Sequence, residues 1–176
     1  MSEVSVALEV LQYAMRNERL GHCFYLRAME MTADDKGKKM FRAIASDEQQ
    51  HLAILRRQLN SLKKTGNWVV LEKARGKRVA SPRVLFPGEE AEVDKLIQKR
   101  ASDLDALDIA LDLERRGHEL YRKEAEKAAD LTARAVYQYL AKEEDKHFTL
   151  LQKARSYLAS RGEWLWDDLQ HPMLDG

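Results

Sequence analysis

Cysteine, proline and long apolar runs are scarce in this chain, and each scarcity excludes a class of protein. Because Cys23 is its one cysteine, the chain can form neither an internal disulfide nor a metal site made of cysteines alone. Three prolines and eight glycines in 176 residues are too few breaks for a protein of many short strands. No basic start precedes an unbroken apolar run, so we expect no signal peptide, no membrane span and a cytoplasmic location.

An excess of charge of either sign is also lacking. The 30 basic residues nearly balance the 29 acidic ones, and this balance argues against nucleic acid as a partner. Charged residues nevertheless make up 34% of the chain, a proportion that suits long helices with one solvent-facing side. Length and composition together predict one all-helical domain over residues 1–176.

What the sequence does contain is an internal repeat. When the chain is shifted by 96 residues, segment 14–70 aligns with 110–166 without a gap. Rare residue types stay in register, which chance seldom achieves: the matched pairs include Gly21 and Gly117, His22 and His118, Tyr25 and Tyr121, and Trp68 and Trp164. We interpret the repeat as a duplication.

Each copy predicts a hairpin of two helices, because apolar residues recur in it at spacings of three and four. The hairpins span residues 5–65 and 102–160, with turns near 33–37 and 129–131. Ser102 followed by Asp105 is a candidate N-cap for the third helix.

A long crossover, residues 66–101, joins the two copies. Its glycines and prolines predict mostly irregular chain over 66–88, and a short helix is expected over 89–100. In the tail, 161–176, we expect the tryptophans Trp164 and Trp166 to cover a bundle end. The predicted fold class is therefore all-α, a ferritin-like four-helix bundle with one long crossover between helices 2 and 3. The pattern leaves open whether the hairpins pair within one chain or are exchanged between chains.

Each predicted helix carries one glutamate in the middle of its apolar stripe: Glu18, Glu48, Glu114 and Glu144. A buried, ionised carboxylate costs several kcal/mol unless it is paired or neutralised. Each glutamate lies 15 residues from the centre of its turn, so in antiparallel hairpins all four lie in one layer.

Two of these glutamates begin the same short motif. Glu48 precedes His51 and Glu144 precedes His147 by three residues, a spacing that places both side chains on one helix face. Four carboxylates carry a charge of −4, which two divalent ions would neutralise. The sequence therefore predicts a dimetal site made of Glu18, Glu48, His51, Glu114, Glu144 and His147.

The residues that carry these patterns resemble a known family. The segments AMRNERLGHCFYLRA, SDEQQHLAIL, LFPGEEAE, DLDALDIALDLERRGHELY and KEEDKHFTLL are similar to the rubrerythrin-type di-iron domain of the ferritin-like superfamily, over roughly residues 5–160. The resemblance implies two bound iron ions, although such ligands also suit manganese or zinc. It implies that Glu18 and Glu114 bind one metal each, that Glu48 and Glu144 bridge, and that His51 and His147 cap one metal each. Tyr25 and Tyr121 would hold carboxylates across the bundle.

The activity implied by the resemblance is that of an oxidoreductase in which the same six residues are catalytic. It would reduce peroxide or dioxygen with electrons from a separate donor protein, and we expect it to be a homodimer. The alternatives are a non-catalytic iron-binding, storage or delivery protein, and a bundle that metal only stabilises. Two departures from the family bear on the activity: Gly117 stands where another glutamate is usual, and the sequence lacks a four-cysteine domain.

Several neighbouring residues have more than one reading. His22 and His118 are further nitrogen ligands, hydrogen-bond partners of the carboxylates, or ordinary core residues. The glycine before each of them leaves space beside the metals or allows close helix packing. Asp47 and Glu143 directly precede predicted ligands and point about 100° away on the helix, so we expect both to face solvent.

Overall fold

Six helices make up the described part of the computed structural model, which covers residues 3–76, 87–97 and 102–164. They are α1 (Glu3–Met31), α2 (Asp35–Thr65), α3 (Leu71–Arg75), α4 (Pro87–Ile97), α5 (Asp103–Lys127) and α6 (Leu131–Arg161). None of these helices is long and apolar enough to cross a membrane. The expectation for Trp166, and the rest of the tail beyond Trp164, lies outside the described residues.

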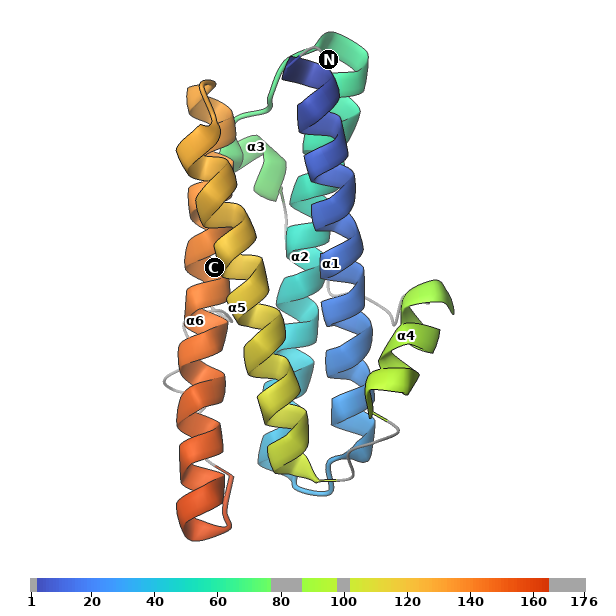
Figure 1. Ribbon diagram of the computed structural model, residues 1–176, viewed down its shortest axis with the longest axis vertical. Helices are drawn as coiled ribbons and strands as arrows, with labels where there is room; N and C mark the ends of the chain where they lie inside the picture. Colours follow the sequence, from blue (N-terminus) through green and yellow to red (C-terminus); the bar gives the residue numbers. More distant parts are fainter. Residues whose placement is uncertain (1–2, 77–86, 98–101, 165–176) are drawn as a thin grey trace.

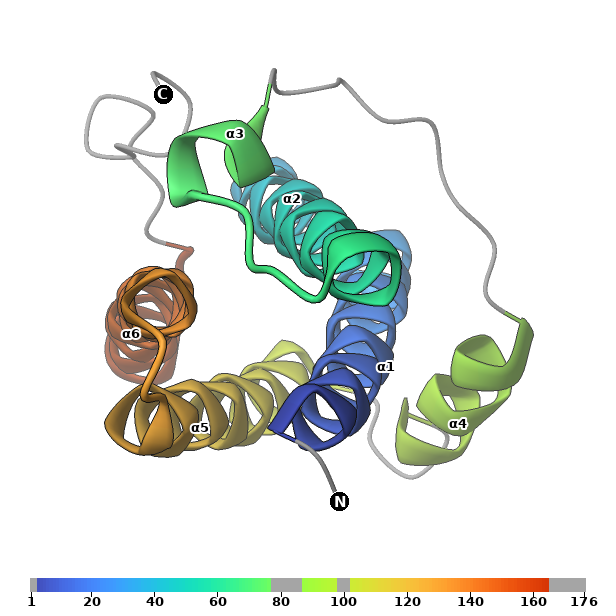
Figure 2. The same cartoon turned by 90° about the horizontal axis from the view of Figure 1, so that it is seen from above.

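The four long helices form the predicted bundle of two hairpins. α1 pairs with α2 and α5 pairs with α6, and all four run along the long axis of the molecule (Figure 1). Seen from the end, α1 lies beside α5, while α2 and α6 form the other side of the bundle (Figure 2). The prediction of a ferritin-like, all-α fold is confirmed.

The helix ends follow from capping residues that the duplication repeats. Asp34 and Asp130 begin the second helix of each hairpin, and each accepts hydrogen bonds from backbone N–H groups of the first turn. Gly66 and Gly162 end the same helices with φ of 70° and 68°, a left-handed conformation that suits glycine. The Ser102 hydroxyl accepts from the Asp105 N–H, which confirms the predicted N-cap of α5.

The described part of the crossover before residue 77 contains one short helix, α3, within the segment expected to be mostly irregular. Two side chains of α2 hold this part of the chain in place. Gln58 bonds the backbone N–H and C=O of Val69 at 2.9 and 2.7 Å, and Arg57 donates to the carbonyls of the last turn of α3. The short helix predicted over 89–100 is present as α4, beginning two residues earlier, at Pro87.

A polar layer divides the core of the bundle into two apolar clusters. On α1, Leu11 and Met15 belong to one cluster and Phe24 and Ala28 to the other, with Glu18 between them. The same division recurs on the other three long helices. The bundle is therefore built so that its one buried band of charge lies near mid-height.

Candidate metal centre

The six predicted ligand residues converge in that polar layer. All six side chains are buried, none more than 4% exposed. They fall into two groups whose ligand atoms lie within 4.8 Å of one another: Glu18, Glu48, His51 and Glu144, and Glu48, Glu114, Glu144 and His147. Glu48 and Glu144 belong to both groups. This sharing is the arrangement expected of two bridging carboxylates.

The two histidines face the carboxylates through the same nitrogen. His51 Nδ1 lies 3.3 Å from Glu18 Oε2 and 3.2 Å from Glu144 Oε1. His147 Nδ1 lies 3.1 Å from Glu114 Oε2 and 3.4 Å from Glu48 Oε1. Each histidine therefore faces one glutamate of its own hairpin and one of the other, and the two halves are related as the duplication predicts.

Several polar atoms in this layer lack hydrogen-bond partners among the described residues. They are Glu18 Oε2, Glu48 Oε1, Glu144 Oε1 and His51 Nδ1, the atoms that converge in the first group. A buried polar atom without a partner costs about 1–3 kcal/mol. Oxygen and imidazole donors aimed at one point fit a divalent cation, which would satisfy all four atoms together. The family resemblance and this cluster point to a metal site.

The titration of these groups reflects the crowding of charge. Burial, and then the charges of Glu18 and Glu114, raise the pKa of Glu48 to about 8. Burial and the neighbouring carboxylates raise the pKa of Glu144 well above its usual value. Burial alone would lower the pKa of His51 and His147, but the surrounding carboxylates outweigh it and the pKa of each is raised. Without metal, the cluster therefore holds protons in place of cations.

Two tyrosine hydroxyls donate hydrogen bonds to the cluster from across the bundle. The hydroxyl of Tyr121 on α5 donates to Glu18 on α1, and the hydroxyl of Tyr25 on α1 donates to Glu114 on α5. Both phenols are fully buried, and burial followed by the nearby carboxylates raises the pKa of each. The phenols therefore stay protonated and act as donors that fix the two unshared glutamates.

The two glycines make room for the shared carboxylates. A Cβ atom at Gly21 would lie 2.4 Å from Glu48 Oε2, and one at Gly117 would lie 2.4 Å from Glu144 Oε2. Both distances are far inside van der Waals contact. The structure therefore supports the interpretation that these glycines leave space beside the cluster, rather than only allowing close helix packing. The place of the additional family glutamate is also filled here by the Glu144 carboxylate.

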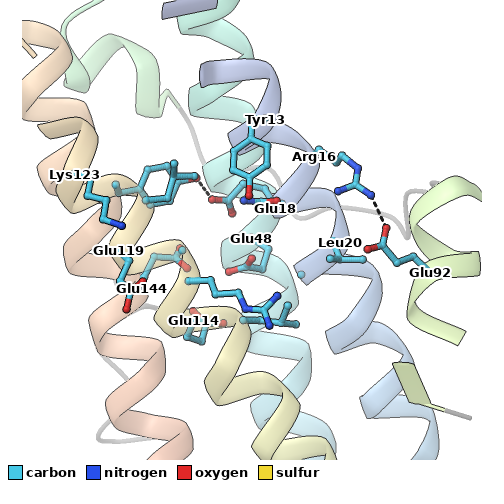
Figure 3. Close-up of a pocket in the computed structure, with 17 residues that line it drawn as sticks. Tyr13, Arg16, Glu18, Leu20, Glu48, Glu92, Glu114, Glu119, Lys123 and Glu144 are labelled. Carbon is cyan, nitrogen blue, oxygen red and sulfur yellow. Dashed lines mark hydrogen bonds and ion pairs between the residues drawn. The ribbon is translucent and has the colours of Figure 1, made fainter. Parts of the chain in front are cut away.

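A groove between α1 and α5 leads from the surface to all four glutamates. Its volume is about 400 Å³, and Gly21 and Gly117 are among the residues that line it. Figure 3 shows Glu18, Glu48, Glu114 and Glu144 together in this groove. The histidines do not line it, so the carboxylate side of the cluster faces the groove and the histidine side faces α2 and α6. Arg16 and Lys123 stand on opposite sides of the groove in Figure 3.

The expectation that Asp47 and Glu143 face solvent is wrong. Asp47 is 5% exposed, and its Oδ2 lies 3.3 Å from His147 Nε2. Glu143 is 8% exposed and pairs with Lys146 at 2.6 Å. The side of α2 that turns away from Glu48 meets α6 rather than water. The missed signal was the four-residue spacing from Asp47 to His51, which places both on one side of the helix.

His22 and His118 bond the backbone within their own hairpins. Their Nδ1 atoms lie 2.8 Å from the Ala45 carbonyl and 3.0 Å from the Ala141 carbonyl, respectively. Neither belongs to the two groups of candidate ligands. Of the readings left open by the sequence, these contacts support hydrogen-bonding residues that join the helices of each hairpin.

Comparisons with known proteins support the family and the fold. The sequence profile of the rubrerythrin family matches residues 9–155. Among solved structures, a hypothetical protein, MJ0754, from Methanococcus jannaschii DSM 2661 is similar with a TM-score of 0.64 at 20% identity. The similarity covers 94% of this chain and 89% of that one, and at this identity it supports the fold alone. No curated protein matched the sequence.

Proposed function

Because the chain belongs to the rubrerythrin family, we propose that it is a di-iron oxidoreductase that reduces peroxide or dioxygen with electrons from another protein. One observation carries the proposal: buried carboxylates and imidazoles converge in two groups that share two glutamates, and the first group contains four atoms that lack hydrogen-bond partners among the described residues. Such a cluster is stable when two cations neutralise it, and oxygen-rich sites with one nitrogen per metal suit iron.

The ligand roles follow from the two groups. Glu18 and His51 would serve one metal and Glu114 and His147 the other, while Glu48 and Glu144 would serve both. Bound iron would supply redox equivalents and open coordination positions for an oxidant. The protein residues hold the unshared glutamates through two phenols and leave the carboxylate side open to the groove.

The groove gives small oxidants a route to the carboxylates of the cluster. Besides the four glutamates of the cluster, its lining carries the basic side chains Arg16, Arg116 and Lys123 and the acids Glu92 and Glu119. Arg16 pairs with Glu92 at 2.6 Å and Arg116 pairs with Asp112 at 2.5 Å, so these charges compensate one another. The choice of an oxidoreductase over iron storage or delivery therefore rests on the buried cluster and the family, not on the charge of the groove.

Electrons must come from outside the chain, because its single cysteine cannot form a four-cysteine iron site. A separate donor protein, a homodimeric assembly and a cytoplasmic location remain predictions. Reduction of peroxide to two waters consumes two electrons and two protons, and a di-iron centre can store both electrons between encounters with the donor.

Stopped-flow mixing of anaerobic, ferrous-loaded protein with peroxide tests the proposal. We expect stoichiometric oxidation of two irons per chain, much faster than that of free ferrous ion, and its loss in Glu48→Gln/Glu144→Gln. Glu143→Gln, which changes a neighbouring carboxylate outside both ligand groups, is the matched control and should react as the wild type does. If the protein binds two irons that react no faster than free ferrous ion, the proposed activity is wrong.

A further inference from the structure

Two rows of aromatic side chains run outward from the cluster. In one, here called the Tyr137 row, the ring centroids of Tyr121 and Tyr137 lie 6.4 Å apart and those of Tyr137 and Trp68 lie 5.6 Å apart. In the other, the Phe41 row, Tyr25 and Phe41 lie 6.2 Å apart and Phe41 and Trp164 lie 5.5 Å apart. Each row thus links a hydrogen-bonded tyrosine at the cluster to a tryptophan.

The rows are related by the same 96-residue shift as the cluster. Tyr25 corresponds to Tyr121, Phe41 to Tyr137 and Trp68 to Trp164. The inner ends are also equivalent, because Tyr121 donates to Glu18 and Tyr25 donates to Glu114. The rows cross between copies, since each tryptophan packs on an aromatic ring of the other hairpin.

The two rows differ in their middle and at their outer ends. The middle ring is a phenol at Tyr137 but a plain phenyl at Phe41. Trp68 is partly exposed, whereas Trp164 is 4% exposed and its indole N–H donates to Asp103 Oδ2 at 3.1 Å. The Tyr137 row therefore reaches solvent and the Phe41 row ends inside the protein.

These differences matter for electron transfer. Electron tunnelling through protein weakens exponentially with distance, so transfer over a long span is fastest in short steps between side chains that can be oxidised and reduced. Tryptophan and tyrosine lose an electron at accessible potentials, whereas phenylalanine does not. Only the Tyr137 row has an oxidisable ring at every step.

We propose that the Tyr137 row is an electron relay, through which a one-electron donor at the surface near Trp68 reduces the metal centre. The inference rests on the proposed function only for the metal centre that receives the electrons. Peroxide is the oxidant: the centre that it has oxidised takes one electron from Tyr121, each ring regains its electron from the next ring outward, and the donor at the surface loses one electron to Trp68. Each ring therefore loses and regains one electron, and no bond between heavy atoms is formed or broken. Two such passages supply the two electrons that one peroxide consumes.

The inner phenol, Tyr121, has a base for its proton during the transfer. The Tyr121 proton shifts to Glu18 along their hydrogen bond when the ring is oxidised, and returns when it is reduced. No proton is consumed in this step, because it returns to its own ring.

The relay residues are held rigidly. Tyr121 and Tyr137 are 1% and 3% exposed. Trp68 precedes Val69, whose backbone is bonded on both sides by the fully buried Gln58. This anchoring keeps the indole against Tyr137 in the turn between α2 and α3 and fixes the distances on which transfer depends.

Laser flash photolysis of the Zn²⁺-loaded, full-length protein tests the relay without iron chemistry. Photo-oxidised ruthenium tris(bipyridine) in solution withdraws an electron from exposed aromatic residues, and the tryptophan and tyrosyl radicals are followed by their separate absorption bands. In the wild type we expect a fast phase in which tryptophan radical converts to tyrosyl radical. Tyr137→Phe and Trp68→Phe should lose this phase.

The matched control is Tyr139→Phe, which removes another phenol of α6, one that packs under Arg75 rather than on Trp68. It should keep the fast phase. Phe41→Tyr should also leave it unchanged, because the Phe41 row ends at the buried Trp164. A fast phase that survives in Tyr137→Phe, or is lost equally in Tyr139→Phe, overturns the relay.

A second experiment separates the relay from the proposed function. Iron-loaded protein is mixed with peroxide in the absence of a donor, and oxidised Trp68 is quantified by tandem mass spectrometry. We expect Trp68 oxidation to fall in Tyr137→Phe but not in Tyr139→Phe. If photolysis gives the expected pattern while iron-loaded protein consumes no peroxide, the relay stands and the proposed oxidoreductase activity is wrong.

Discussion

Replacement of Gly117 or Gly21 by alanine is the smallest change that should disturb the metal centre. Each new methyl carbon would lie 2.4 Å from a carboxylate oxygen of Glu144 or Glu48, where ordinary contact begins at 3.4 Å. The carboxylate must therefore retreat by about 1 Å, toward the other carboxylates of the cluster. Gly88→Ala is the matched control, because a Cβ there meets nothing within 4 Å.

The substitutions should change metal affinity more than the free energy of unfolding. Overpacking in a buried site typically costs about 1–3 kcal/mol, whereas glycine to alanine inside a helix gains about 1 kcal/mol. The free energy of unfolding of the metal-free protein should therefore fall by no more than about 2 kcal/mol. Metal binding should suffer more, because ligands displaced by 1 Å lie outside the roughly 0.5 Å tolerance of a functional site. We expect affinity for at least one ion to fall about 10–100-fold.

Chelator-competition titrations, with metal content measured on the same samples, test this expectation. Gly21→Ala and Gly117→Ala should behave alike because the two contacts are equivalent. Gly88→Ala should bind both ions as the wild type does. The reasoning is refuted if Gly117→Ala binds two ions with wild-type affinity, since Glu144 would then not need the space that the glycine leaves.

Three further changes bear on the same layer. Asp47→Asn should weaken binding of one of the two ions about 10–100-fold, because it removes the contact that orients His147. Glu143→Gln should leave metal binding unchanged, because Glu143 pairs with Lys146. Equal effects of the two substitutions in a chelator titration would contradict the assignment. Tyr121→Phe removes a hydrogen bond to a carboxylate and should lower the unfolding free energy of the metal-loaded protein by about 1.5–3 kcal/mol in denaturant titrations. The pKa of Glu48 is raised to about 8, so the folded metal-free protein binds more protons than the unfolded chain between about pH 4.5 and 8. Its thermal stability should therefore fall across that window while the stabilisation by added metal grows; a metal-free protein that becomes more stable with rising pH would contradict this.

The convergence of the six candidate ligands could be predicted because their signal is local and repeated. Two Glu-x-x-His motifs and two further glutamates lie at equal distances from their turns, and helical geometry alone brings them to one height. The bundle follows from the same periodicity. The turns near 33–37 and 129–131 could also be predicted. The structure shows that the helix ends are set by Asp34, Asp130, Gly66 and Gly162, residue types with strong capping preferences.

The features that the sequence did not reveal depend on contacts between helices. Asp47 could be placed relative to Glu48 on its own helix, but only the packing of α2 against α6 turns it toward His147. Likewise α3 is supported by side chains of α2, because Arg57 bonds its last turn and Gln58 bonds Val69 just before it. The glycines of the crossover do not predict these contacts. The readings left open at Gly21 and Gly117 required the position of the opposing carboxylates.

The duplicated halves agree at the candidate ligands and differ at the residues that support them. Asp47 holds His147, which belongs to the group containing Glu114, whereas its counterpart Glu143 pairs with Lys146 instead. The proposed relay ends at Glu18, which belongs to the other group, the one with His51. The two departures from symmetry therefore affect opposite candidate metal positions. If both proposals hold, one position would be stiffened through its histidine and the other would be connected to the surface, so a centre with near-equivalent ligands would acquire a fixed direction for electron delivery.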